Sequence, residues 1–218
     1  MLSKSEENYL KAMFHLSAQY SKGISTNAIA KQLETKASSV TDMVKKLADK
    51  ELVLYKKYQG VTLTKQGEKI AVNIIRKHRL WEVLLVEKLN FNWDEVHEVA
   101  EQLEHIQSEK LIDELDEFLG FPKRDPHGDP IPDKDGNINF QEKVLLSTLN
   151  SEASAICVGV KDTSSEFLKY LDKQGIALGK EMKVLEKEKF DNSMRIEMEE
   201  KEYVISFQIA NNIYVKNL

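Results

Sequence analysis

The sequence predicts an α+β multidomain protein with a winged helix-turn-helix, a helical dimerisation domain and a C-terminal SH3-like β barrel. Apolar residues recur with helical spacing through most of the first half, interrupted by one pair of β-rich segments. A turn-rich stretch at residues 120–137 holds all four prolines, and beyond it apolar and polar residues alternate. We therefore expect domains at residues 1–65, 66–122 and 150–218, with a linker at 123–149.

The first two expected helices lie close together at the N-terminus. Residues 5–20 form an amphipathic pattern in which Tyr9 and Met13 share a face. A short helix then ends near Leu33, and Ser25 or Thr26 can cap its start.

A third helix and a hairpin complete the N-terminal domain. The helix is expected at about residues 37–49, where Ser38 and Ser39 are suitable capping residues. Two β-rich runs within residues 52–64 flank Tyr58-Gln59-Gly60 and predict a hairpin. Helix, short helix, turn, helix and hairpin in this order indicate a winged helix-turn-helix.

Three further helices are expected at residues 66–89, 93–107 and 108–119. They carry more apolar side chains than three helices can bury among themselves. The set comprises Leu80, Leu84, Leu85, Leu103, Ile106, Leu111, Ile112 and Leu115. This excess predicts a dimer interface, and hence a homodimer.

The last 70 or so residues predict a small β barrel of SH3-like size. A strand-like or extended segment at 140–147 comes first, and a short helix is expected at 165–173. The candidate strands are residues 155–160, 182–188, 194–198 and 202–209.

Charge is distributed unevenly along the chain. The net charge is −5, yet residues 1–79 hold 15 Lys or Arg and 7 Asp or Glu, whereas the remainder holds 16 and 29. A basic N-terminal part and an acidic remainder favour a polyanion such as DNA as the partner of the first domain.

Several classes of protein are disfavoured by what the sequence lacks. No segment has the length of apolar residues that a membrane span needs, no signal-peptide core is present, and Cys157 is a single cysteine. We therefore expect a cytoplasmic protein with no membrane partner. His97-Glu98-Val99-Ala100-Glu101 lacks the second histidine of the zincin motif, and no phosphate-binding glycine loop occurs, so we expect neither an enzyme nor a small-molecule substrate.

Histidines and glutamates gather on two of the middle helices and predict a metal site. On the helix at 93–107, helical spacing places His97, Glu101, Glu104 and His105 in one stripe. On the preceding helix, His78 and Glu82 lie one turn apart. Imidazole and carboxylate ligands without a thiolate suit Mn²⁺ or Fe²⁺ better than a structural zinc ion.

Several segments, in order along nearly the whole chain, resemble the diphtheria-toxin-repressor family of metalloregulators. SSVTDMVKKL is similar to the family's recognition helix, and YQGVTLTKQG to its wing. RKHRLWEVLL and VHEVAEQLEH resemble the helices that carry its ligands, and LGFPKRDPHGDPIP its linker. The resemblance is to the manganese-sensing branch that keeps a C-terminal SH3-like domain.

The resemblance implies two metal sites. The regulatory site would use Glu101, Glu104 and His105, with a contribution from position 8, here Asn8. A second site would use His78, Glu82 and His97. Some relatives instead complete that second site with a Cys-Pro-His segment of the linker and an acidic residue of the C-terminal domain. The matching residues here are Asp125, His127 and Asp162, with Glu166 as a further candidate.

Two positions bear on the identity of the metal ion. Iron sensors of the family have a cysteine where this chain has Glu101, and manganese sensors have a glutamate, so the resemblance favours Mn²⁺, with Fe²⁺ as the alternative. Position 8 is methionine in iron sensors and aspartate in manganese sensors. Asn8 departs from both, although its amide oxygen can ligate a metal without charge.

The resemblance implies a repressor that binds double-stranded operator DNA as a dimer when its metal is bound, and that controls metal-uptake genes. The third helix would enter the major groove. Short side chains near its start would reach the DNA, and lysines around them would contact phosphates. The candidates are Ser38, Ser39, Thr41 and Asp42, and Lys36, Lys45, Lys46, Lys56 and Lys57. A metal-independent winged-helix regulator is the other alternative.

Overall fold

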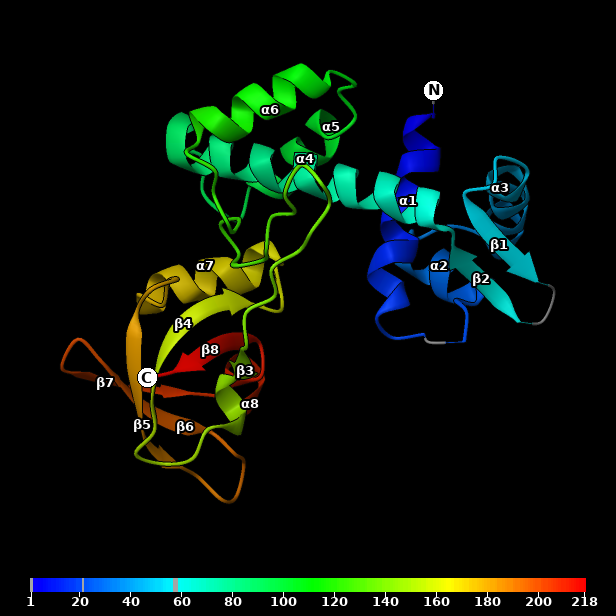
Figure 1. Cartoon of the computed structure of the whole chain (residues 1–218). Coiled ribbons are helices and arrows are strands. Elements are labelled where there is room, and N and C mark those ends of the chain that lie inside the picture. Colours follow the sequence, from blue (N-terminus) through cyan, green and yellow to red (C-terminus); the bar gives the residue numbers. More distant parts are fainter. Residues whose placement is uncertain (1, 21, 57–58) are drawn as a thin grey trace. The chain divides into compact units, whose positions relative to one another are not determined.

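The computed structural model describes residues 2–20, 22–56 and 59–218 (Figure 1). The chain divides into two compact units. The first contains the chain up to Trp81 together with Glu101–Phe118 and Pro132–Ile138, and the second contains Glu82–Ala100, Leu119–Ile131 and Asn139–Leu218.

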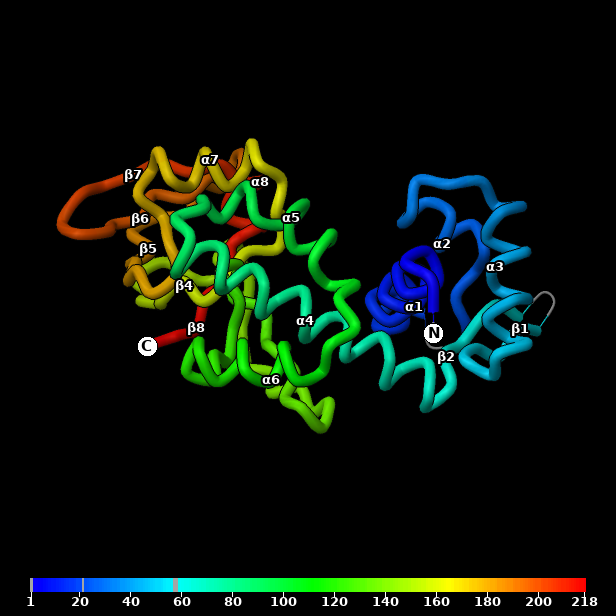
Figure 2. Tube along the Cα trace, turned by 90° about the horizontal axis from the view of Figure 1, so that it is seen from above, coloured from blue at the N-terminus to red at the C-terminus, as the bar shows by residue number. Residues whose placement is uncertain are grey.

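Three helices form the N-terminal part of the first unit: α1 (Lys4–Ser17), α2 (Thr26–Gln32) and α3 (Ala37–Asp49) (Figures 1 and 2). Ser3 begins α1 with a capping box in which its side chain accepts from the Glu6 amide and its amide donates to the Glu6 carboxylate. Ser25 caps α2 by accepting from the Ala28 amide, which confirms the prediction.

The recognition-helix candidate α3 begins differently from the prediction. Its N-cap is Lys36, whose carbonyl accepts from the Val40 amide and whose side chain makes no capping hydrogen bond. Ser38 and Ser39 were expected as caps, which is wrong, because helical bonding begins before them. Both serines lie exposed in the first turn, whereas Val40 is buried.

The wing consists of β1 (Val53–Lys56) and β2 (Gly60–Leu63), which pair antiparallel. Ile24 adds an isolated bridge to Val61, with hydrogen bonds of 2.8 and 2.9 Å in the two directions. Gly23 precedes this bridge with a φ of +118°, and a Cβ there would lie 2.4 Å from the Gln59 carbonyl oxygen. Glycine is therefore required for the wing to pack against the helices.

Three helices follow: α4 (Lys65–Leu89), α5 (Val96–Leu103) and α6 (Glu109–Phe118). The prediction of one helix over 93–107 is wrong at both ends. Residues 93–95 form a turn closed by the Glu95 amide on the Asn92 carbonyl. Beyond Leu103 the chain turns again, since the Ile106 amide bonds the Leu103 carbonyl. Glu104 and His105 therefore lie in a turn rather than on a helical stripe.

The apolar surplus expected on these helices is smaller than predicted. Leu80, Leu85, Ile112 and Leu115 are all buried within the single chain. Leu111 remains exposed, and the others of the set are half-buried.

The second unit contains a six-stranded antiparallel sheet in the order β3-β8-β4-β5-β6-β7. Its strands are β3 (Val144–Leu145), β4 (Ser154–Val160), β5 (Glu181–Lys187), β6 (Met194–Met198), β7 (Lys201–Ile205) and β8 (Ile213–Asn217). A 3₁₀ turn, η1 (Leu146–Thr148), follows β3. Helix α7 (Ser165–Gln174) contributes Phe167, Leu168 and Leu171 to the core of the sheet.

The prediction of a strand over 202–209 is wrong in its second half. The short helix α8 (Phe207–Ala210) begins after β7, because Ser206 caps it by accepting from the Ile209 amide. Strand β3 lies within the strand-like or extended stretch expected at residues 140–147, whereas β8 was not predicted. The two strands pair with each other at one edge of the sheet. Within the described residues, no helix is both long and apolar enough to cross a membrane.

The buried carboxylate of Glu6 ties α1 to α3. Its Oε1 lies 2.6 Å from Lys50 Nζ and 3.2 Å from Lys46 Nζ, and its side chain is 1% exposed. Burial alone would raise the pKa of Glu6, but hydrogen bonds from Lys50, the Ser3 amide and Lys46 lower that pKa to about 2.

We predict that Glu6→Gln lowers the free energy of unfolding at pH 7 by about 1–3 kcal/mol, because two lysines lose their charged acceptor. The contribution of Glu6 is complete above the ordinary carboxyl pKa of 4.5 and is lost as the pH falls towards 2. Urea unfolding at pH 7 and pH 3 measures it, and the deficit should shrink at pH 3. A matched exposed carboxylate, Glu68→Gln, should change little, and an equal loss in both variants would contradict the assignment.

Candidate metal centre

One face of α1 carries the polar side chains that meet the segment after α5. Glu7 and Lys11 lie one turn apart on this face, and Asn8 lies three residues before Lys11. Glu7 is buried despite its polar side chain. The opposite side of α1 packs into the core of the winged helix through Leu10 and Met13. This helix therefore joins the polar cluster to the DNA-binding part of the first unit.

His105 is oriented by Glu7. The Nδ1 of His105 lies 2.5 Å from Glu7 Oε2, and Gln107 Nε2 donates to Glu7 Oε1 at 2.8 Å. Because a carboxylate only accepts, Nδ1 carries the proton in this contact. In the neutral imidazole the other ring nitrogen, Nε2, would carry the lone pair, and it lies 3.8 Å from Glu104 Oε1.

Glu104 is the most deeply buried acid of the cluster. Its side chain is 0% exposed, and its Oε2 accepts from His78 Nδ1 at 2.6 Å and Lys11 Nζ at 2.8 Å. Burial alone would raise the pKa of Glu104, but the hydrogen bond from His78 and the charge of Lys11 lower it below its usual range. Glu104 is therefore held as a carboxylate.

Two buried acceptor atoms of this unit lack a hydrogen-bond donor. Within the described part of the chain, Asn8 Oδ1 and Glu104 Oε1 are buried and make no hydrogen bond. A buried oxygen without a donor is costly unless a cation or water satisfies it. Glu104 Oε1 also lies near the Nε2 lone pair of His105. Oxygen and imidazole nitrogen are the donor types that a hard divalent cation accepts. Glu101, Glu104 and His105 do not, however, form one of the metal-ligand groups found among the described residues, so the regulatory site stays a prediction.

A second set of ligands lies in the second unit. Glu82, Asp125 and His127 are all buried, and one ligand atom from each lies within 4.8 Å of the others. Asp125 Oδ1 accepts from the amides of His127 and Asp129, which closes the turn. This set matches the linker residues implied by the resemblance.

The segment that carries His127 is held against strand β4. The Val160 amide donates to the His127 carbonyl at 3.0 Å. Gly128 follows with a φ of +88°, and a Cβ there would lie 2.1 Å from the Val158 carbonyl oxygen. Only glycine allows this approach, so the backbone around His127 is tied to the sheet.

The ring of His127 is placed with one nitrogen towards the acids. Its Nε2 donates to the Trp93 carbonyl at 2.8 Å, and its Nδ1 lies 3.7 Å from Glu82 Oε2. Burial alone would lower the pKa of His127, but Glu82, Asp125 and the Trp93 carbonyl raise it to about 9. This placement resembles that of metal-ligating histidines, whose second nitrogen commonly donates to a carbonyl or carboxylate.

The remaining predicted ligands are placed differently. His97 Nδ1 lies 3.5 Å from Glu82 Oε1 in the second unit, whereas His78 belongs to the first unit and contacts Glu104. The grouping of His78 with Glu82 and His97 joins two units and stays a prediction. Asp162 accepts from the Ser164 amide and Glu166 is exposed, and neither belongs to the metal-ligand groups found among the described residues.

Sequence reasoning missed three residues around the predicted regulatory site, namely Glu7, Lys11 and Gln107. Glu7 orients His105, Lys11 contacts Glu104, and Gln107 holds Glu7. The one local signal was the spacing of Glu7 and Lys11 on a face of an amphipathic helix. Their partners lie about a hundred positions away.

The predicted DNA contacts lie on the exposed side of α3 and on the wing. Lys36, Ser38, Ser39, Asp42, Lys45, Lys46 and Lys56 are exposed, and Lys57 lies outside the described residues. Thr41 is half-buried, and its hydroxyl donates to the Ala37 carbonyl at 3.0 Å. Lys46 is also paired with Glu6, so part of its charge is neutralised within the protein.

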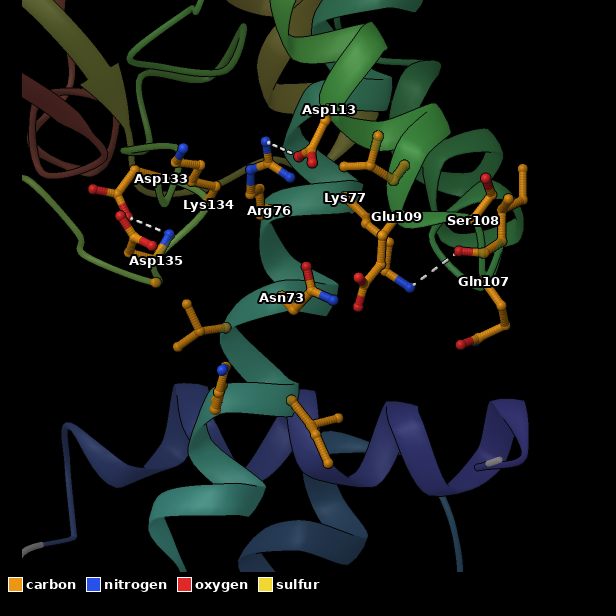
Figure 3. Close-up of a pocket in the computed structure, with 16 residues that line it drawn as sticks. Asn73, Arg76, Lys77, Gln107, Ser108, Glu109, Asp113, Asp133, Lys134 and Asp135 are labelled. Atoms are coloured by element: carbon orange, nitrogen blue, oxygen red, sulfur yellow. Dashed lines mark hydrogen bonds and ion pairs between the residues drawn. The ribbon is translucent and has the colours of Figure 1, made fainter.

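A cavity of about 540 Å³ lies elsewhere in the first unit, between α4, α6 and the loop around Asp133 (Figure 3). Three of its charged side chains are engaged with other groups of the protein. Arg76 pairs with Asp113, Lys77 donates to the Ile106 carbonyl, and Asp133 accepts from the Asp135 amide (Figure 3). This pairing disfavours the cavity as a ligand site.

Three family profiles match the chain in succession. Residues 1–61 match the iron dependent repressor N-terminal DNA binding domain, and residues 64–133 match the iron dependent repressor metal binding and dimerisation domain. Residues 144–217 match the FeoA domain.

A solved structure described as a manganese-dependent transcriptional repressor in complex with manganese is 32% identical, with a TM-score of 0.85, and the match covers 98% of this chain and 100% of that one. An uncharacterised HTH-type transcriptional regulator of Methanocaldococcus jannaschii is 36% identical over 54% of this chain and 94% of its own length. The iron-dependent repressor IdeR of Mycobacterium leprae is 32% identical over 58% of this chain, a match that spans only about half (54%) of that protein. These likenesses establish that the chain belongs to the diphtheria-toxin-repressor family of iron- and manganese-dependent transcriptional repressors.

Proposed function

We propose that this repressor binds operator DNA as a homodimer in the cytoplasm when Mn²⁺ occupies its regulatory site, and that it controls metal-uptake genes. One observation carries the proposal. Glu104 Oε1 is a buried acceptor without a hydrogen bond, and it lies 3.8 Å from the lone-pair nitrogen of His105. Two electron-pair donors at this separation suit a cation between them.

Asn8, Glu101, Glu104 and His105 would hold the ion, and Glu7 would position His105 through its Nδ1 proton. When bound, the ion supplies positive charge that links α1 to the segment after α5. The protein's own contacts would carry the effect onward, since Glu6 of the same helix pairs with Lys46 of α3 and with Lys50, the residue that follows α3. Metal binding would thereby favour one orientation of the recognition helix.

Mn²⁺ is proposed over Fe²⁺ because the donor set contains carboxylates and an amide oxygen but no thiolate. Glu101 supplies the carboxylate at the position where iron sensors have cysteine. Fe²⁺ remains the alternative, since imidazole and carboxylate also bind it. Both ions belong in the first titration.

A metal-independent winged-helix regulator is the second candidate function. Such a regulator would bind DNA with the same α3 and wing. The buried oxygens of Asn8 and Glu104 that make no hydrogen bond would then have no role. The two functions differ in whether chelation changes the affinity for DNA.

We predict that Mn²⁺ strengthens DNA binding by about tenfold or more, within the usual range of coupling between two sites. The measurement is a gel shift with duplexes selected from a randomised library in the presence of MnCl₂, repeated in EDTA. Glu104→Gln should abolish the difference, because the neutral amide removes the buried anionic ligand.

The matched control is Glu114→Gln, an exposed carboxylate on α6 that should leave the Mn²⁺ response intact. Circular dichroism melting checks that Glu104→Gln is folded. Equal affinity with Mn²⁺, with Fe²⁺ and in EDTA for the unmodified protein would support the metal-independent regulator instead.

We also propose that Glu82, Asp125 and His127 form a second metal site, and predict that His127→Gln lowers the number of Mn²⁺ ions bound per chain by one in equilibrium dialysis. Glutamine keeps a polar side chain but removes the imidazole nitrogen that faces Glu82. Glu166→Gln tests the acidic residue suggested for this site and should leave the count unchanged. If His127→Gln binds the same number of Mn²⁺ ions per chain as the unmodified protein, the proposal of the second site is wrong.

For DNA recognition, we predict that Lys45→Ala weakens binding to all duplexes alike. It should also lower the steepness of the plot of log affinity against log salt concentration by about 0.9 for each phosphate that the protein no longer neutralises. Ser39→Ala should instead alter which selected duplexes bind best, because the exposed hydroxyl lies near the start of α3. Gel shifts over a salt series separate the two effects. A sequence-dependent weakening in Lys45→Ala would contradict the assignment to the DNA backbone.

A further inference from the structure

Lys11 places a cation inside the cluster of predicted metal ligands. Its Nζ lies 2.8 Å from Glu104 Oε2 and 3.5 Å from Glu101 Oε1, and its side chain is 13% exposed. An ammonium group in contact with two carboxylates already supplies part of the positive charge that a metal ion would bring.

We propose that Lys11 is an internal counter-ion that competes with the metal for Glu104 and Glu101 and thereby sets the metal concentration at which the repressor responds. The inference rests on the proposed function, since it concerns the same site. In this proposal Lys11 opposes metal binding, whereas the ligands of the site favour it.

The competition follows from the charges and from the contacts of the two acids. Glu104 Oε2 is shared between Lys11 and His78, so one oxygen of that carboxylate is engaged without metal. A divalent ion bound to Glu101 and Glu104 would face the Lys11 ammonium at short range, and like charges repel strongly in a buried site. Lys11 must either move aside or weaken the ion's binding.

Lys11 also changes what is expected of the metal-free protein. Glu7, Glu101 and Glu104 place three carboxylates around one small region, and without a cation they would repel one another. Lys77, the other buried lysine nearby, interacts electrostatically with Glu7 and Glu104 but donates its hydrogen bond to the Ile106 carbonyl. Lys11 is thus the ammonium that contacts Glu104 directly, and it stabilises the metal-free arrangement.

The test compares Lys11→Met, which keeps the length of the side chain but removes the charge, with the unmodified protein. We expect Lys11→Met to bind Mn²⁺ about tenfold tighter or more, the size expected for loss of a charged hydrogen bond. Calorimetric titration with MnCl₂ measures this affinity directly. Without metal, the melting temperature of Lys11→Met should fall, so that its rise on addition of Mn²⁺ exceeds that of the unmodified protein.

Two further variants control for charge and for the helix. Lys11→Arg keeps a cation at this position and should stay close to the unmodified affinity. Lys4→Met removes an exposed lysine from the same helix and should change neither affinity nor melting. Should Lys11→Met prove poorly folded in EDTA, Lys11→Gln is measured in its place with the same expectation.

The outcomes distinguish this inference from the proposed function. Tighter Mn²⁺ binding in Lys11→Met alone supports the counter-ion. If the unmodified protein binds Mn²⁺ and Lys11→Met binds it equally or more weakly, the inference is overturned while the proposed function stands. If neither protein binds Mn²⁺ or Fe²⁺, both fail.

Discussion

The contact between α1 and the turn after α5 connects the two activities of the first unit. Glu7 holds His105 and Lys11 holds Glu104, so polar side chains of the winged helix reach directly into the predicted ligand set. The same helix is fastened to α3 by Glu6. These contacts give the proposed coupling a continuous physical route from the ligand cluster through α1 to the recognition helix.

Electrostatic balance explains why this contact can respond to a metal ion. Buried carboxylates are stable only when they are paired, and Glu104 has His78 and Lys11 on one oxygen and no hydrogen bond on the other. If both oxygens of Glu104 were paired within the protein, a metal ion would gain little by binding them. If neither oxygen were paired, the buried charge would destabilise the fold. Partial satisfaction leaves the cluster stable and still receptive to a cation.

In the second unit, the β sheet supports the turn that carries the candidate metal ligands Asp125 and His127. The turn that carries Asp125 and His127 is hydrogen-bonded to β4, and Gly128 allows the close approach. Trp93 fixes the outer nitrogen of His127 through its carbonyl, and its indole donates to Asp172 of α7. Removing the sheet would therefore remove the support of this ligand set.

The sequence by itself determined the types of ligand, the order of the winged helix and the family. These features are local, because periodicity, capping residues such as Ser25 and short motifs act within a few residues. Only the tertiary structure decided that Glu104 and His105 lie in a turn, that Glu7 and Lys11 join them, and that β3 pairs with β8. Lys11 and Glu104 are 93 positions apart, and contacts over such separations depend on how whole elements pack, which no local pattern records.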